Sequence, residues 1–189
     1  MREFSRIDRG FYARDTVRVA KDLLGKMLVR RINRTLVSGI ITETEAYRQA
    51  DDPASHAHRG MTERNRVMFG EVGIAYVYFT YGMHYCVNVV AKNKDHDAGA
   101  VLIRSIKPVS GIEVMIRNRG MDDSKNLTNG PAKLAAALDI TKKQYGEDMV
   151  NSKSLYITTG PEMACKISAG PRIGISRGSE MLWNFRMAI

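Results

Sequence analysis

The residues with the most potential chemistry lie together in the stretch 40–59, IITETEAYRQADDPASHAHR. Alternate residues of a strand project from one face, so Glu43, Glu45 and Tyr47 are expected to point the same way. The polar loop that follows carries His56. Glu43 also fits a solvated edge strand, where a charged side chain favours solubility. Glu45, Tyr47 and His56 together form the acid, aromatic and imidazole set that suits a flat polar ligand.

The tyrosines are a second signal, because five of the eight fall in one part of the chain: Tyr47, Tyr76, Tyr78, Tyr81 and Tyr85. Tyr76 and Tyr85 fit packing residues of half-buried strands. In a basic protein, Tyr47, Tyr78 and Tyr81 favour stacking against bases that have left a nucleic-acid duplex. Tyr81 lies in a predicted tight turn, so we expect it to be exposed and able to act as a wedge between base pairs.

Several polar residues have a structural and a functional interpretation. Arg104 interrupts the apolar segment VLIRSI. It fits either an edge-strand arginine with its head in water or a guanidinium that keeps a carboxylate ionised and orients a water. Asn88 in CVNVVA fits a structural amide or a ligand contact equally. His56 and His58 form an HxH pair, but zinc needs three or four firm ligands, so we favour hydrogen bonding and stacking by His56.

The length and composition predict one basic domain. A chain of 189 residues can bury one good core and is short for two, so a single domain over 1–189 is expected. The net charge of +9, spread along the chain, is a reasonable electrostatic footprint for nucleic acid. The sequence contains no apolar run near the roughly 18 residues that span a bilayer, and MREFSRIDRG has the pattern of neither a signal nor a transit peptide. Cys86 and Cys165 are expected to be reduced, packed thiols, as in a cytoplasmic protein.

The order of predicted elements indicates an α+β fold. Alternation and turn residues predict strands at 26–32, 35–47, 74–80, 83–91, 100–106, 154–159, 172–175 and 183–189. Cap and stop residues predict helices at 16–24, at 62–69, ahead of Gly120 and after Gly130. Ser110 and Glu113 have capping-box spacing for the third of these helices. Strands in hairpins with helices between them predict a mixed, largely antiparallel curved sheet surrounded by helices.

Seven segments occur in the order found in a known family: ETEAY, DDPASHAH, TERNRVMF, YVYFTYGMHYCVNVV, AVLIRSIKP, TNGPAKLAAAL and GPRIGI. From about Phe11 to Ile189 the chain resembles the alkyladenine (3-methyladenine) DNA glycosylases of the mammalian type. Several blocks in one order are far more specific than a single motif. The resemblance implies a monofunctional base-excision enzyme that flips a damaged purine out of duplex DNA and hydrolyses its N-glycosidic bond.

The resemblance also implies catalytic roles for residues of this chain. Glu45 matches the general base of the ETEAY motif. Arg104 and the backbone carbonyl of Ile173 match the groups that hold the catalytic water. Asn88 matches the asparagine that disfavours undamaged guanine by crowding its exocyclic amine. The family implies neither a metal nor another cofactor.

The positions that meet the DNA follow from the same resemblance. Tyr47 and Tyr78 match the two walls that stack on the flipped base, and His56 matches the histidine that contacts it. Tyr81 matches the residue that intercalates into the gap left in the duplex, with Met83 beside it. The expected partner is double-stranded DNA that contains a damaged purine, bound by a monomer.

Departures from the family and competing functions complete the sequence-based expectations. The turn 93–99 is longer than in the mammalian members, and the sequence ends at NFRMAI, where the family continues through a further short strand with a glycine. One alternative function is a non-catalytic module that stacks single-stranded bases on the tyrosines. Another is metal-assisted hydrolysis through His56 and His58. A third is a glycosylase with lyase activity, which would use a lysine amine as nucleophile.

Overall fold

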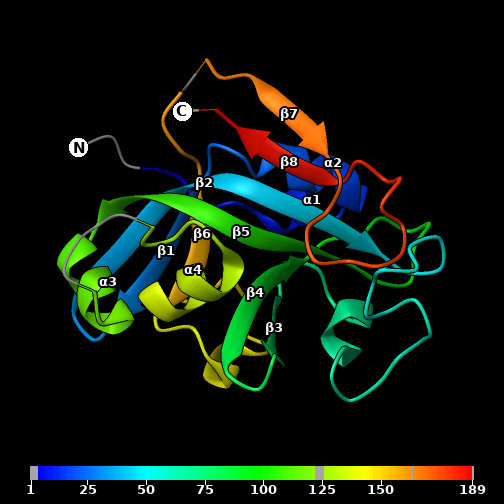
Figure 1. Cartoon of the computed structure of the whole chain (residues 1–189), viewed down its shortest axis with the longest axis horizontal. Helices are drawn as coiled ribbons and strands as arrows, with labels where there is room; N and C mark the ends of the chain where they lie inside the picture. The colour runs from blue at the N-terminus through cyan, green and yellow to red at the C-terminus, as the bar shows by residue number, and fades with distance from the viewer. Residues whose placement is uncertain (1–3, 122–125, 163, 189) are drawn as a thin grey trace.

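The computed structural model describes residues 4–121, 126–162 and 164–188. Among these residues, eight strands form one sheet in which every strand pair is antiparallel. The strands are β1 Met27–Ile32, β2 Thr35–Arg48, β3 Ala75–Thr80, β4 His84–Val90, β5 Gly99–Ser110, β6 Leu155–Thr158, β7 Ile167–Gly170 and β8 Asn184–Met187. Their main order is β3-β4-β5-β2-β1-β6, and β8 joins β2 to β7. The predicted α+β class with a largely antiparallel curved sheet is confirmed (Figure 1).

Short helices pack on this sheet. They are α1 Arg9–Tyr12, α2 Thr16–Asp22, α3 Ile112–Arg119 and α4 Pro131–Ala137, with 3-10 turns η1 Arg66–Phe69 and η2 Lys142–Gln144. α2 packs on β2 and β5, α4 packs on β4 and β5, and α3 lies beside α4 (Figure 1). Within the described residues, no helix combines the length and apolar character needed to cross a membrane.

The long strand β2 is the centre of the sheet and positions the stretch 40–48. It pairs with β5 on one side, and on the other side first with β1 and then with β8. Register shifts between Ile41 and Thr44 mark a bulge, which bends a strand and redirects its side chains. The Thr44 hydroxyl donates a 2.7 Å hydrogen bond to the carbonyl of Ala20, which fixes α2 on β2. Glu45 and Tyr47 therefore project from a strand that is held on both sides.

The β3–β4 hairpin extends from the lower side of the sheet as drawn in Figure 1. Its turn residues Tyr81 and Gly82 have φ of 51° and 68°. Two left-handed residues give the turn that matches the right-handed twist of hairpin strands. Tyr81 is 83% exposed and Met83 is 69% exposed, so the hairpin presents two large apolar side chains to solvent. The predicted turn and the exposure of Tyr81 are confirmed.

Two predicted elements around the site are wrong. The helix expected at 62–69 shortens to η1, because the Asn65 side chain accepts from the N–H of Thr62 and donates to the carbonyl of Gly60. Local side-chain bonds of this kind compete with a helix. The strand expected at 172–175 is a turn with φ of 77° at Gly174, and the strand of this region is β7 instead.

The predicted capping box ahead of α3 is also wrong. Ser110 remains in β5, which continues well past the predicted end at 106, and its hydroxyl donates to the carbonyl of Leu36 at 3.3 Å. α3 starts after Gly111, whose φ of 70° turns the chain from strand to helix without a side-chain cap. The predicted last strand is confirmed in shorter form as β8, and Ile189 lies outside the described residues.

Candidate active site

A cavity of about 490 Å³ opens beside β3, β4 and β5. Its walls also include the end of β2, the loop that follows β2, and the turn 173–175. Figure 1 shows the β7–β8 loop reaching toward the loop after β2, which brings distant segments to one place. The cavity is lined by seven of the nine predicted site residues: Tyr47, His56, Tyr78, Tyr81, Asn88, Arg104 and Ile173.

Glu45 lies behind this wall and is fully buried. Its Oε1 accepts hydrogen bonds from the backbone N–H of Ile173 at 2.7 Å and from the Asn184 amide at 2.9 Å. Its Oε2 accepts from the Tyr47 hydroxyl at 2.8 Å and from the Arg104 guanidinium at 3.2 Å. Four donors, one of them cationic, compensate for the loss of water around this carboxylate.

The neighbouring carboxylate, Glu43, belongs to the same cluster. Its Oε1 accepts from Arg104 at 3.2 Å, from Asn184 at 2.8 Å and from Arg186 at 3.0 Å. The solvated edge-strand interpretation of Glu43 is therefore wrong, because β2 has partners on both sides. The edge-strand interpretation of Arg104, with its head in water, is also wrong, because the residue is only 8% exposed. Its guanidinium joins the two carboxylates instead of extending into water.

Aromatic and imidazole side chains form the opposite part of the cavity. The His56 ring meets the Tyr78 ring edge-on with centroids 4.7 Å apart, and its Nδ1 lies 2.8 Å from the Tyr76 hydroxyl. His56 is accessible from the cavity, yet the protein around it desolvates the ring. This desolvation and the nearby Arg64 guanidinium lower the pKa of His56 to about 4, so the imidazole is neutral at pH 7. Tyr76, interpreted above as a packing residue, is buried and also fixes His56.

Asn88 and Cys86 complete the wall on β4. The Asn88 amide donates a 2.9 Å hydrogen bond to the backbone carbonyl of Tyr76 while the residue lines the cavity. The structural and the ligand-facing interpretations of Asn88 are therefore compatible. Burial raises the pKa of the Cys86 thiol, so it remains protonated. In the part of the chain that the structure describes, no three His, Cys, Asp or Glu side chains gather as a metal site would require.

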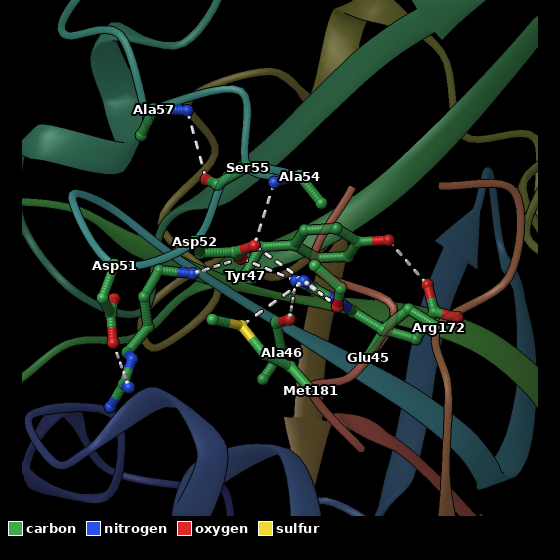
Figure 2. A network of polar contacts seen from close by, with 12 residues as sticks. Glu45, Ala46, Tyr47, Asp51, Asp52, Ala54, Ser55, Ala57, Arg172 and Met181 are labelled. Carbon is green, nitrogen blue, oxygen red and sulfur yellow. Dashed lines mark hydrogen bonds and ion pairs between the residues drawn. The ribbon is translucent and has the colours of Figure 1, made fainter. Parts of the chain in front are cut away.

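A buried ion pair between Arg172 and Asp52 packs against the Tyr47 ring. Arg172 donates to both carboxylate oxygens of Asp52, at 2.6 and 2.7 Å, and neither side chain is exposed. The Arg172 guanidinium carbon also lies 4.7 Å from the centre of the Tyr47 ring. Figure 2 shows these contacts together with the bond from the Tyr47 hydroxyl to Glu45. The pair therefore joins the β7–β8 loop to the loop after β2.

The sequence matches the methylpurine-DNA glycosylase (MPG) family over residues 10–188. The chain belongs to this family. The resemblance drawn from the sequence blocks is thereby confirmed, and the protein is an enzyme of the DNA glycosylase class, a hydrolase of DNA repair.

Relatives of this glycosylase align over nearly their whole length. One from Carboxydothermus hydrogenoformans is 51% identical over 180 residues, which cover 95% of this chain and 93% of the relative. One from Clostridium acetobutylicum is 44% identical over 189 residues, covering 94% and 91%. One from Methanocella arvoryzae is 46% identical over 175 residues, covering 92% and 86%. All three carry the name "Putative 3-methyladenine DNA glycosylase".

Sequence reasoning missed three residues of the candidate site. Asn184 bonds both Glu43 and Glu45, and its signal was an amide inside the apolar segment LWNFRM, the same signal that identified Asn88. Arg172 and Asp52 form the buried pair described above. Arg172 stands directly before Ile173 in GPRIGI, but no pattern in the sequence joins it to an aspartate so far away.

Proposed function

We propose that this glycosylase is monofunctional and removes alkylated or deaminated purines from duplex DNA, among them 3-methyladenine, 7-methylguanine, hypoxanthine and ethenoadenine. In this proposal the damaged purine flips into the cavity, and a water activated by Glu45 hydrolyses its N-glycosidic bond. The observation that carries the proposal is a buried carboxylate directly behind an aromatic cavity, held by four donors.

The chemistry requires a negative charge near C1′ of the sugar. Loss of a purine passes through an oxocarbenium-like transition state, as other glycoside cleavages do. The Glu45 carboxylate stabilises that positive charge and takes a proton from the attacking water. Arg104 and the backbone carbonyl of Ile173 orient the water, and both residues line the cavity.

The water needs an acceptor position on Glu45. A carboxylate offers about four such positions, and the donors around Glu45 already use four. Of these donors, only the Tyr47 hydroxyl belongs to a ring on which a base would stack. In this proposal the Tyr47 ring stays in place, and its O–H bond rotates away from Oε2 when the water binds, which leaves that acceptor position to the water.

Selectivity combines shape, charge and hydrogen bonding. Tyr47 and Tyr78 stack on the flipped purine, and a cationic alkylated ring gains up to about 2 kcal/mol from such faces when it is desolvated. Neutral His56 offers a hydrogen bond without repelling that charge. The Asn88 amide, fixed by Tyr76, crowds the exocyclic amine of undamaged guanine. Damaged bases also unpair at lower cost.

The β3–β4 hairpin and the basic charge serve duplex binding. The exposed Tyr81 inserts into the gap left by the flipped base, with Met83 beside it. The net charge of +9 supplies phosphate contacts, and one small domain acts on the duplex as a monomer. Hydrolysis by water, and not imine formation, is favoured because none of the cavity-lining residues in the described chain is a lysine.

The experiment that tests this function is base release from duplex oligonucleotides that hold one hypoxanthine, ethenoadenine or 7-methylguanine, in EDTA. Wild type should release the free base and leave strands that break only after alkali, while Glu45→Gln should release none and still bind the DNA. Normal release by Glu45→Gln would disprove the role of the carboxylate. No release by wild type, with DNA binding intact, would support the non-catalytic binding module instead.

A further inference from the structure

The pair of Arg172 and Asp52 is more elaborate than a simple ion pair. Besides the two bonds to Asp52, Arg172 Nη1 donates to the backbone carbonyl of Ala46 at 2.9 Å. Asp52 in turn accepts from the backbone N–H of Arg48 and from that of Ala54, each at 3.1 Å. Arg172 therefore holds a backbone carbonyl of β2, and Asp52 holds a backbone N–H of the same strand (Figure 2).

These contacts enclose Tyr47 from both sides along the chain. The residue before it, Ala46, is held through its carbonyl by Arg172, and the residue after it, Arg48, is held through its N–H by Asp52. The guanidinium lies 4.7 Å from the centre of the Tyr47 ring. Tyr47 lines the cavity and Arg172 does not, so the ring separates the guanidinium from the cavity. The conformation of Tyr47 is thus fixed in backbone and in ring.

The same arginine also sets the position of a donor to Glu45. Ile173, the next residue in the chain, donates its backbone N–H to Glu45 Oε1 at 2.7 Å. Gly178 closes the loop around the guanidinium, since a Cβ there would lie 3.1 Å from Arg172 Nη2 and its φ is 66°. Moving Arg172 would therefore move both Tyr47 and the N–H of Ile173 relative to the carboxylate.

We propose that the buried pair of Arg172 and Asp52 positions the catalytic site, by fixing the stacking ring of Tyr47 and the N–H of Ile173 against Glu45. Arg172 and Asp52 are positioning residues and touch no substrate. The proposal rests on the hydrolytic function proposed above. It concerns the rate of base release and not the affinity for DNA.

A merely structural role is the main competing explanation. Buried ion pairs contribute little net stability, and replacing both partners by apolar residues of similar size is often neutral or stabilising. Arg172 Nε is moreover buried with no hydrogen-bond partner among the described residues, which costs stability. The bonds of the pair to backbone groups of Ala46, Arg48 and Ala54 do stabilise the two loops, so stability and base release must be measured separately. Only a positioning role predicts a loss of base release in a variant that remains folded.

The test uses the double variant Arg172→Met/Asp52→Leu, because single variants would leave a buried charge unpaired and lose stability. We expect a lower melting temperature than that of wild type, because backbone groups of Ala46, Arg48 and Ala54 lose their partners, so base release is measured at a temperature at which circular dichroism shows the variant to be folded. Single-turnover release of hypoxanthine should fall about 100-fold, as displacement of a site by about 1 Å can cause. Affinity for a duplex with an abasic-site analogue should stay within about threefold, since no base then needs the Tyr47 ring.

Arg48→Met is the matched control. The Arg48 guanidinium also packs on Trp183, as that of Arg172 does, and it also pairs with aspartates, but among the described residues its hydrogen bonds and ion pairs go to Asp15 and Asp51 and not to Tyr47 or Glu45. The control should release hypoxanthine within about threefold of wild type. Equal losses in the control and in the double variant would overturn the proposal, because they would show a general effect of perturbing this region.

Two further outcomes would overturn the proposal. One is release by the folded double variant at the wild-type rate. The other is a crystal structure of that variant in which the Tyr47 ring and the 2.7 Å bond from Ile173 to Glu45 are unchanged. The crystal structure does not depend on activity, so it separates this proposal from the function: absence of base release by wild type would count against the function alone.

Discussion

The Tyr47 hydroxyl donates a 2.8 Å hydrogen bond to Glu45 Oε2, although the two residues are only two positions apart on β2. Burial and the neighbouring Glu45 carboxylate raise the pKa of Tyr47 well above its usual value, so the hydroxyl keeps its proton and remains a donor. The tyrosine whose ring lines the cavity therefore also hydrogen-bonds the carboxylate proposed as the general base. In the proposed mechanism, recognition of the damaged purine and activation of the water are therefore linked through one side chain.

This link predicts different effects for two substitutions of Tyr47. Tyr47→Phe keeps the stacking face and frees one acceptor position of Glu45, so single-turnover release of hypoxanthine should equal or exceed the wild-type rate. Tyr47→Leu removes the aromatic face, worth about 1–3 kcal/mol per stacked base, and should slow release at least about 10-fold. A loss in Tyr47→Phe as large as that in Tyr47→Leu would contradict the link, because it would make the hydroxyl itself essential.

The depressed pKa of His56 predicts its behaviour in a pH titration. The ring should gain its proton near pH 4 in the folded protein, against about 6.5 in the unfolded chain. Proton NMR can follow its ring signal, assigned by comparison with His56→Asn. A midpoint near pH 6.5 for that signal would show that cavity water solvates the ring fully.

The same pKa fixes the sign of the stability change. As the pH falls from 6.5 to 4, the unfolded chain binds a proton at His56 that the folded protein does not bind. The contribution of His56 to stability should therefore be present above pH 6.5 and decrease through this window. Chemical denaturation at pH 7 and pH 4.5 should show a smaller loss for His56→Asn than for wild type.

Local chemistry explains what could be predicted from the sequence. Alternation along β2 placed Glu45 and Tyr47 on one face, and the glycine after Tyr81 indicated the tight turn that exposes it. These inferences needed only neighbours within a few residues. The resemblance carried by the seven sequence blocks then implied roles for Asn88 and Arg104, and the structure places both beside the cavity.

The remaining features depend on contacts between distant segments. Glu43 does not lie on an edge strand because β8 pairs with β2 at this position. No residue near Glu43 in the sequence indicates that pairing. The pair of Arg172 and Asp52 spans 120 residues, and the sequence predicted Asp52 in a polar loop and Arg172 at the start of a strand. The segment 172–175 has the apolar content of a strand, yet its backbone is committed to holding Glu45 and to the turn at Gly174.

The charge of the chain predicts the salt dependence of DNA binding. Each phosphate contact made by a lysine or arginine releases counterions, so the logarithm of the affinity falls linearly with the logarithm of the salt concentration. With a net charge of +9, affinity for a duplex with an abasic-site analogue should fall at least about 10-fold between 50 and 200 mM salt. Affinity that does not change over this range, measured by fluorescence anisotropy, would exclude phosphate contacts as the main source of binding.

The exposed hairpin tip predicts a defect confined to duplex DNA. Tyr81→Asn suits the left-handed backbone at this position, since asparagine tolerates a φ of 51°, and should change the free energy of unfolding by no more than about 0.5 kcal/mol. It removes the wedge that fills the gap in the stack, so release from a duplex should fall at least about 10-fold, while release from a single strand, which has no gap to fill, should stay near wild type. Arg34→Ala, at the exposed β1–β2 turn, is the control for a surface change. Equal losses on duplex and single strand would place the effect of Tyr81 in the cavity that it borders instead of in the duplex.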